Sequence, residues 1–261
     1  MSKKYELVVD DTITFWGWKL FRIKALISFG SVDAGDLGGY IHTEDNLSQE
    51  GDAWVYGDAW VYGDAKVSGD AKVYGNAKVS GNAWVYGNAW VYGNAWVYGN
   101  AEVYGDAKVS GNAWVYGNAW VYGNAKVYGN AKVSGNAEVS GNAEVYGDAK
   151  VSGDAKVYGN AWVYGNAWVY GDAKVYGNAK VSGNAKVSDL GDVIVFKNHW
   201  SSGRHFAYTK SNKMWRVGCF YGTGQELIDK AYRDSKKSGD FYKAYVEFVE
   251  KLEALNEPKR P

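Results

Sequence analysis

Histidine and cysteine are scarce in this chain, and their positions limit the chemistry it could perform. Among 261 residues there are three histidines, His42, His199 and His205, and one cysteine, Cys219. His199, His205 and Cys219 could form a nucleophile and general base if the fold brought them together. The same three residues could equally have structural or surface roles, and so short a pattern favours that interpretation. We therefore predict no catalytic residue, no metal site, no cofactor and no enzymatic activity.

A glycine-containing segment near the C-terminus is a second candidate. Gly222-Thr223-Gly224 precedes a predicted helix and could cradle a phosphate at the helix N-terminus. It lacks the full glycine pattern of a P-loop or of a dinucleotide-binding turn. Thr223-Gly224-Gln225-Glu226 instead has the spacing of a capping box, in which the Thr and Glu side chains each bond a backbone N–H of the other. The sequence therefore favours an ordinary helix N-terminus over a phosphate-binding one.

Aromatic side chains are the most abundant groups that could recognise a partner. The chain has 13 Trp and 22 Tyr, and in its central part each Trp is followed two residues later by Tyr. In an extended segment both rings would point to the same outer side. A large exposed aromatic surface usually marks an interface. The alternative is that the rings merely clad neighbouring strands, with lysine stems over them. The candidate interaction face is Trp54, Trp60, Trp84, Trp90, Trp96, Trp114, Trp120, Trp162, Trp168, Tyr98 and Tyr116, and the candidate C-terminal recognition residues are Trp200, His205 and Trp215.

These aromatic residues belong to a six-residue repeat. From Gly51 to Ser188 the chain consists of 23 consecutive hexads, Gly-(Asp/Asn)-Ala-x-Val-(Tyr/Ser), in which x is Trp, Lys or Glu. Ala and Val lie two apart and would point to one side of a strand, with x on the other. Gly followed by Asp or Asn suits a tight corner. One hexad buries too little to fold alone, so the repeats must stack into a solenoid with a continuous Ala/Val core.

The pattern resembles the hexapeptide-repeat superfamily, whose members are left-handed parallel β-helices. In that superfamily an aliphatic residue is followed four positions later by a small one, as Val55 is followed by Ala59. The resemblance implies three hexads per coil, so that residues 18 apart stack on one of three faces. More narrowly, these arrays look like uncharacterised bacterial and phage or prophage repeat proteins. The predicted fold class is an all-β solenoid with an N-terminal β-hairpin cap and a small C-terminal α+β domain.

The enzymes of that superfamily are acyltransferases and γ-type carbonic anhydrases, which use histidines on the coils as general base or metal ligands. All three histidines here lie outside the array, so those catalytic positions have no counterparts. The expected function is a non-enzymatic rigid scaffold, phage- or prophage-related, that self-associates through its Trp and Tyr faces. One alternative is a ligand-binding or host-antagonist phage protein that uses the aromatic faces or an oligomer groove. A degenerate acyltransferase is the second alternative.

The flanking segments are expected to cap the array. Residues 1–50 are predicted to form a β cap, with strands over 12–16 and 19–26 joined by a turn at Gly17-Trp18. The solenoid is expected to span 51–196, since residues 191–196 fit the hexad template as a last, degenerate rung. Residues 197–261 are expected to form a β-hairpin, turning at Ser211-Asn212, plus two helices. Phe241, Tyr245, Phe248, Leu252 and Leu255 form a helical stripe that should pack on the hairpin, a dimer seam being the alternative.

Composition and charge narrow the range of partners that this protein is expected to bind. Lys plus Arg and Asp plus Glu are 29 each, so a net charge of zero gives no long-range attraction to nucleic acid or to an anionic membrane. The single cysteine excludes an internal disulfide framework and fits a reducing compartment. The sequence has neither the apolar core of a signal peptide nor a run long enough to span a membrane. We expect a cytoplasmic protein, in the host cytoplasm if phage-encoded, that binds copies of itself, with a trimer favoured, or another protein. Binding of a small molecule or a sugar is an alternative that the sequence leaves open.

Overall fold

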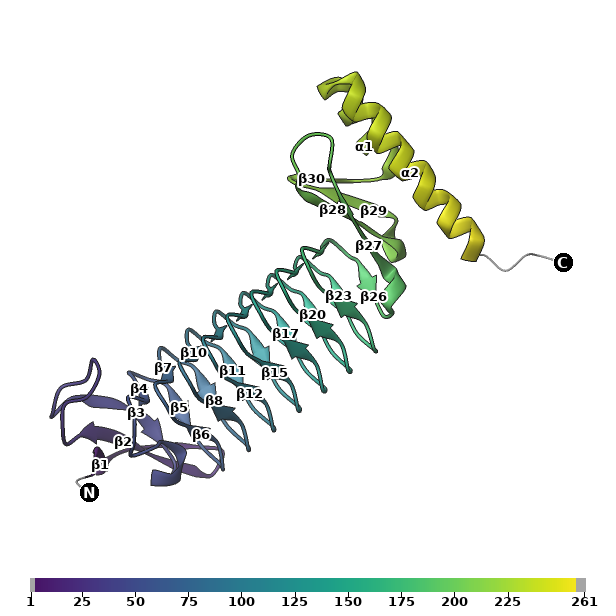
Figure 1. The fold of residues 1–261 in the computed structure, drawn as a ribbon. Coiled ribbons are helices and arrows are strands. Elements are labelled where there is room, and N and C mark those ends of the chain that lie inside the picture. Colours follow the sequence, from purple (N-terminus) through teal and green to yellow (C-terminus); the bar gives the residue numbers. More distant parts are fainter. Residues whose placement is uncertain (1–2, 257–261) are drawn as a thin grey trace.

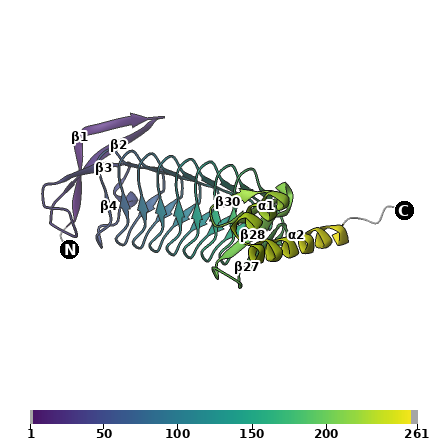
Figure 2. The ribbon, with the colours of Figure 1, turned by 90° about the horizontal axis from the view of Figure 1, so that it is seen from above.

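The computed structural model describes residues 3–256 and shows a long β-solenoid with a β cap at one end and a small domain at the other (Figures 1 and 2). Each of the 23 hexads forms one two-residue strand at its fourth and fifth positions. Strands 18 residues apart pair in parallel, as Trp96 does with Trp114. Three hexads therefore make one coil, and the predicted all-β solenoid is confirmed. The handedness implied by the family resemblance stays a prediction.

The coils stack their strands into three sheets, here called the first, second and third face. The first face holds β4 (Trp54–Val55), β7 (Lys72–Val73), β10 (Trp90–Val91), β13 (Lys108–Val109), β16 (Lys126–Val127), β19 (Glu144–Val145), β22 (Trp162–Val163) and β25 (Lys180–Val181). The second face holds β5 (Trp60–Val61), β8 (Lys78–Val79), β11 (Trp96–Val97), β14 (Trp114–Val115), β17 (Lys132–Val133), β20 (Lys150–Val151), β23 (Trp168–Val169) and β26 (Lys186–Val187). The third face holds β6 (Lys66–Val67), β9 (Trp84–Val85), β12 (Glu102–Val103), β15 (Trp120–Val121), β18 (Glu138–Val139), β21 (Lys156–Val157) and β24 (Lys174–Val175).

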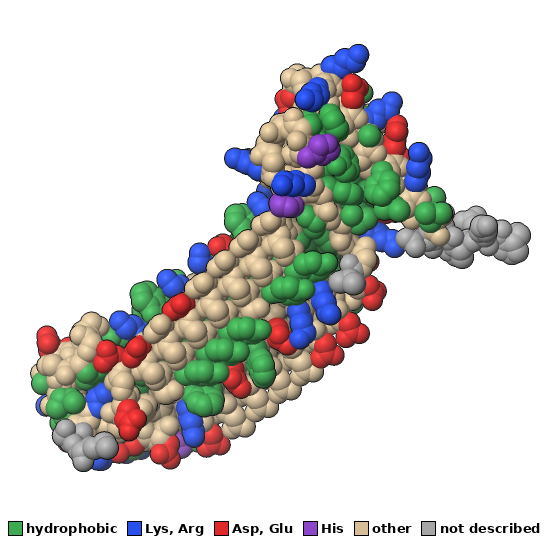
Figure 3. All heavy atoms as spheres, viewed as in Figure 1, with side chains coloured by type: hydrophobic (Ala, Val, Ile, Leu, Met, Phe, Trp, Pro, Cys, Tyr) green, Lys and Arg blue, Asp and Glu red, His purple; other side chains and the backbone are tan. Residues whose placement is uncertain are grey.

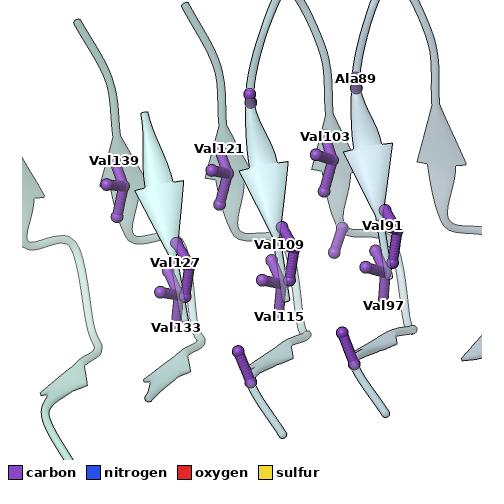
Figure 4. Close-up of a cluster of buried hydrophobic side chains, with 14 of the residues drawn as sticks. Ala89, Val91, Val97, Val103, Val109, Val115, Val121, Val127, Val133 and Val139 are labelled. Atoms are coloured by element: carbon purple, nitrogen blue, oxygen red, sulfur yellow. The ribbon is translucent and has the colours of Figure 1, made fainter. Parts of the chain in front are cut away.

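The core of the solenoid consists of the Ala and Val of every hexad. None of these side chains is more than 2% exposed. Valines from all three faces point into the same interior, and successive coils repeat the arrangement (Figure 4). Burial of this continuous apolar column supplies the main driving force for stacking. Because Ala and Val complete the core, the outward Trp and Tyr are not needed to fill it.

Glycine and asparagine make the corners. At Gly117 φ is +73°, and a Cβ there would lie 3.0 Å from the backbone nitrogen of Gly135 in the next coil. Only glycine accepts both this conformation and this approach. Beside the glycines, asparagine side chains bond from coil to coil, as in the 2.9 Å bond from Asn100 Nδ2 to Asn118 Oδ1. The invariant Gly of the repeat is thus required by the close stacking of corners.

The N–H groups at the fourth and sixth positions of each hexad donate to the coil that follows in sequence. Trp96 N–H donates to the Ala113 carbonyl at 2.9 Å, and Tyr98 N–H donates to the Val115 carbonyl at 3.0 Å. Each coil therefore gives these two N–H groups of every hexad to the next coil, while the paired strands return bonds in the other direction, as in any parallel ladder. As a result, the Ala and Val carbonyls of the first coil are open at the N-terminal end, whereas the N–H groups of the fourth and sixth hexad positions are open at the C-terminal end, so each end needs a different cap.

The N-terminal cap extends the second face. Its central strand β2 (Trp18–Ala25) pairs antiparallel with both β1 (Tyr5–Phe15) and β3 (Leu37–Ile41), and β3 then pairs in parallel with β5. A short 3₁₀ turn, η1 (Glu44–Asn46), follows. The expected hairpin forms, but the turn residues are Trp16 and Gly17, with φ of +48° and +85°. The prediction of Gly17-Trp18 is wrong by one residue, since two left-handed positions are needed and Gly takes the second.

The cap also satisfies the open carbonyls of the first coil. Lys4 Nζ donates to the Ala53 carbonyl at 3.0 Å, and Asn46 Nδ2 donates to the Ala65 carbonyl at 2.8 Å. Tyr40 N–H donates to the Ala59 carbonyl at 2.9 Å. Lys4 is only 2% exposed, and this burial lowers the pKa of its ammonium to about 8. At this end, a carbonyl group on each of the three faces thus accepts a hydrogen bond from the cap.

At the other end the chain leaves the stack. After η2 (Leu190–Asp192), strands β27 (Val193–Lys197), β28 (His205–Thr209), β29 (Met214–Val217) and β30 (Phe220–Gly222) form an antiparallel sheet, with η3 (Lys210–Asn212) between β28 and β29. Val193 pairs with Thr209, so the prediction that residues 191–196 form a last rung is wrong. The reason is local, because Asp189 and Asp192 form a capping box that turns the chain out of the coil.

Two helices cover this sheet. They are α1 (Gly224–Asp234), which begins with the predicted capping box, and α2 (Lys236–Asn256). The apolar stripe expected to pack on the sheet is only partly buried, with Phe248 and Leu255 exposed by 49% and 80%. The buried side of α2 is instead Tyr242, Val246 and Val249. The prediction is therefore shifted by one residue, a rotation of about 100° on a helix of 3.6 residues per turn.

Candidate interaction surfaces

The second face carries a mixed stack of indoles and lysines. Trp96 and Trp114 lie in register on neighbouring strands, with ring centroids 5.6 Å apart and planes inclined by 15°. Lys78 Nζ lies 4.9 Å from the Trp96 ring and 4.2 Å from the Trp60 ring, and Lys132 Nζ lies 4.6 Å from the Trp114 ring. Burial lowers the pKa of Lys78. On this stretch the rings clad the solenoid, and cation–π contacts cover them.

The first face shows the same pairing of Trp with Lys. Lys108 Nζ lies 4.6 Å from the Trp90 ring, and Lys180 Nζ lies 4.1 Å from the Trp162 ring. Each pair occupies neighbouring rungs of the ladder. These indoles are half-buried, and a large part of their surface is used within the chain.

The N-terminal cap covers the first two tryptophans of the array. Trp54 is 1% exposed and lies between Tyr5 and Phe29, whose rings are 6.0 and 5.3 Å away. The expectation that Trp54 belongs to an exposed face is therefore wrong, because it is the anchor of the cap. Trp60 is half-buried against Phe15, at 5.0 Å.

Within the array, the third face presents the most exposed indoles. Trp84 and Trp120 are each 43% exposed, and Trp168 on the second face is 40% exposed. Glu102 pairs with both Trp84 and Trp120, so the two indoles lie two rungs apart with a carboxylate between them. Trp84 Nε1 donates to Ser68 Oγ at 3.2 Å, which fixes the ring in place. Hydrophobic side chains gather along the length of the prism, flanked by charged ones (Figure 3).

Tyrosines at the sixth position of the hexads form columns parallel to the long axis. Tyr98 and Tyr116 stack with centroids 5.0 Å apart and planes within 1°. This separation follows from the spacing of strands, about 4.8 Å. The columns are Tyr74–Tyr92, Tyr86–Tyr104–Tyr122, Tyr98–Tyr116, Tyr128–Tyr146–Tyr164 and Tyr158–Tyr176. Burial between stacked rings raises the pKa of Tyr98 and of Tyr104.

We expect these columns to delay phenol ionisation in the folded protein. Burial, together with the 3.1 Å hydrogen bond to Glu102, raises the pKa of Tyr86 from 10 to about 12. Between these pH values the folded chain holds protons that the unfolded chain has lost, so stability should fall as pH rises from 10 to 12. Tyrosinate absorbance should titrate at higher pH in the folded protein than in urea, and Tyr86→Phe should remove one of the late steps. Coincident folded and unfolded titrations would contradict this expectation.

The C-terminal candidates have different environments. Trp215 is 2% exposed and belongs to the core of the C-terminal domain, so its expected role in recognition is wrong. Trp200 is half-buried and stacks on Phe241 at 4.6 Å. His205 is exposed, and its Nδ1 lies 3.1 Å from Asn178 Nδ2 of the last coil. Of the three candidates, His205 alone is largely open to solvent.

The candidate chemical residues are not assembled into a reactive site. Within residues 3–256, no hydrogen bond joins His199, His205 and Cys219 to one another, and His199 packs edge-on against Phe241 at 5.3 Å. Before α1, the Thr223 N–H donates to Glu226 Oε2 at 2.8 Å, so a carboxylate holds the donor that a phosphate would need. The same residues contain no group of three or more His, Cys, Asp or Glu placed to hold a metal. No helix among them is long and apolar enough to cross a membrane.

A hollow at the end of the third face was not anticipated from the sequence. It has a volume of about 360 Å³ and lies between β24 and β27, where Tyr176, Asn178, Val193, Val195 and His205 line it. Residues 191–196 match the hexad template closely enough to suggest that this space is filled. The break in the hexad frame at Asp189-Leu190 was the only signal in the sequence that it is not.

The fold defines a parallel β-solenoid repeat protein. Several windows of the array match the family described as YdcK beta solenoid repeat, at residues 71–87, 77–93, 83–99, 107–123 and 155–171. The first three windows advance by one hexad each, in agreement with the six-residue strand period of the structure. Together the windows cover less than half of the chain, and the likeness supports a repeat β-solenoid. No curated protein matches the chain.

Proposed function

We propose that this protein is a non-enzymatic, rigid scaffold that associates with copies of itself through the third face of the solenoid. The observation that carries the proposal is the exposure of Trp84 and Trp120, each 43%, on a prism whose core is already complete. Large exposed aromatic groups in line on a flat sheet favour association. Trp96 and Trp114 of the second face contribute less, because lysine ammonium groups already cover them.

Three further observations support a scaffold role. Coil-to-coil hydrogen bonds and close-packed corners make the array stiff along its whole length. All three histidines lie outside the repeat, so the coils carry no general base of the superfamily type. The resemblance of the repeats to phage and prophage proteins supports a role in that setting, and the side-by-side trimers of the hexapeptide superfamily favour three copies.

The experiment is a mass measurement by light scattering and sedimentation. We expect the wild type to have three times the 28.7 kDa mass of one chain, and the double variant Trp84→Lys/Trp120→Lys to be a monomer. Trp168→Lys is the matched control, since this indole is 40% exposed but lies on the second face, and it should remain a trimer. Circular dichroism checks that each variant is folded. A monomeric wild type, or an unchanged mass in the double variant, would refute the third-face interface.

A further inference from the structure

The third face is one rung shorter than the other two faces. Eight two-residue strands stack on the first face and eight on the second, whereas the third ends at β24 after seven. The next rung of that face would come from the residues after Ser188. These residues turn outward through η2 and pair with β28 instead. The hollow beside β24 is therefore the space of a missing rung.

The last strands of the other two faces are covered. On β26 the N–H of Lys186 donates to Ser211 Oγ at 2.9 Å, and just beyond it the N–H of Ser188 donates to Asp192 Oδ2 at 2.8 Å. On the first face, β25 packs against β28 of the C-terminal sheet. The chain thus supplies hydrogen-bond acceptors for the edge of β26 and packs a strand of the C-terminal sheet against β25.

The edge of β24 has donors without acceptors. One coil earlier, the N–H groups of Lys156 and Tyr158 donate to the carbonyls of Ala173 and Val175, each at 2.9 Å. The equivalent N–H groups of Lys174 and Tyr176 point the same way along the axis, toward the hollow. Within the described chain, neither forms a hydrogen bond. An occupant must therefore bring carbonyl oxygens spaced two residues apart, which is the pattern of an extended peptide.

The tyrosine column on this face is also unfinished. Tyr158 and Tyr176 stack at 5.4 Å, and Tyr176 ends the column 50% exposed. In the columns Tyr86–Tyr104–Tyr122 and Tyr128–Tyr146–Tyr164 a third ring stacks at 4.9 to 5.0 Å from the second. Val195, which is 38% exposed on β27, forms an apolar wall of the hollow. The free ring of Tyr176 favours an aromatic side chain on the occupant.

We propose that the β24 edge is a strand-addition site. It binds a short extended peptide segment of a partner protein, in parallel with β24. Two carbonyls of the peptide accept hydrogen bonds from the N–H groups of Lys174 and Tyr176. An aromatic residue that follows stacks on the Tyr176 ring, and the peptide passes beside Val195. This site lies at the C-terminal end of the prism and does not depend on the third-face indoles.

Hydrogen exchange gives the first test. In the free protein the amide of Tyr176 should exchange rapidly, while the amide of Tyr158, which is bonded in the ladder, should be protected at least about a hundredfold more. The probe is a blocked peptide, acetyl-Gly-Asn-Ala-Lys-Val-Tyr-amide, whose sequence is that of one rung. Saturating probe should slow the exchange of Tyr176 and leave Tyr158 unchanged. A Tyr176 amide as protected as Tyr158 in the free protein would overturn the proposal.

Binding of a fluorescent form of the same peptide gives the second test. Val195→Arg fills the hollow from an exposed position and should weaken binding at least tenfold. Tyr176→Ser should weaken binding about fivefold, the size of one aromatic contact. Tyr170→Ser, on the second face of the same coil, is the matched control and should have no effect. Absence of saturable binding to the wild type, or equal binding by Val195→Arg, would refute the site, and a rise in mass without peptide would assign the edge to a second copy.

Discussion

Val151→Asp should destabilise the solenoid by about 4 kcal/mol, because it places an unpaired carboxylate in the core. Val151 is 0% exposed, and the inward neighbours above and below it are Val133 and Val169. No basic or hydrogen-bonding side chain of the array points into this interior, since every inward position is Ala or Val. The carboxylate must therefore be protonated or the coil must open. The measurement is the urea midpoint of unfolding, followed by circular dichroism.

The neighbouring residue provides the control for this prediction. Lys150 precedes Val151 on β20 but points outward and is exposed. Lys150→Asp introduces the same side chain one position away, and surface changes of this kind usually alter stability by less than about 0.5 kcal/mol. A large difference between the two variants is the signature of strict inward and outward alternation. Equal effects would mean that the two-residue period of the rungs does not set the core.

Gly135→Ala should strongly destabilise the array, although it adds only one methyl group. At Gly135 φ is +70°, and a Cβ would lie 2.9 Å from the nitrogen and 3.0 Å from the carbonyl oxygen of Gly153. The left-handed conformation costs an alanine about 1–2 kcal/mol. The clash is with backbone atoms of the next coil, which cannot rotate away, and overpacking of this kind adds about 1–3 kcal/mol. The total loss should be visible as a lower urea midpoint.

Gly57→Ala separates the two costs. Gly57 has a similar φ of +57°, yet a Cβ there would meet no atom within 4 Å. This variant should show the conformational cost alone, about 1–2 kcal/mol. The difference in the free energy of unfolding between the two alanine variants then measures the cost of the clash between stacked corners. If Gly135→Ala were no worse than Gly57→Ala, coil spacing at the corners would be looser than the structure shows.

Much of the fold follows from single hexads. The alternation of Ala, x and Val placed the core and the outer surface correctly, because side-chain direction in a strand depends only on the local backbone. The start of α1 followed from Thr223 and Glu226 for the same reason. Where a local rule left two neighbouring options, as at the Trp16-Gly17 turn and on the buried side of α2, the prediction was wrong by one residue. In both places, packing against other segments of the chain decides between the two neighbouring positions.

Which indoles of the candidate interaction face are exposed depends on contacts between different hexads and with the cap, and a single hexad does not contain these contacts. Trp54 and Trp84 occupy the same repeat position, yet one is 1% exposed and the other 43%. The difference arises because Tyr5 and Phe29 of the cap cover Trp54. In the same way, Lys78 of the preceding rung covers Trp96. These two residues become neighbours only because three hexads close one coil.

The sequence by itself determined a solenoid of 23 rungs with an Ala/Val interior, glycine corners and an aromatic exterior, since these depend on local side-chain direction and on a strict period. The tertiary structure decided which indoles stay exposed and that the stack ends one rung early on the third face. Residues 191–196 resemble the hexad template, with Val and Phe in place of Ala and Tyr. They leave the stack because the capping box of Asp189 and Asp192 turns the chain outward, and they then pair with β28, a partner formed by residues that follow the array.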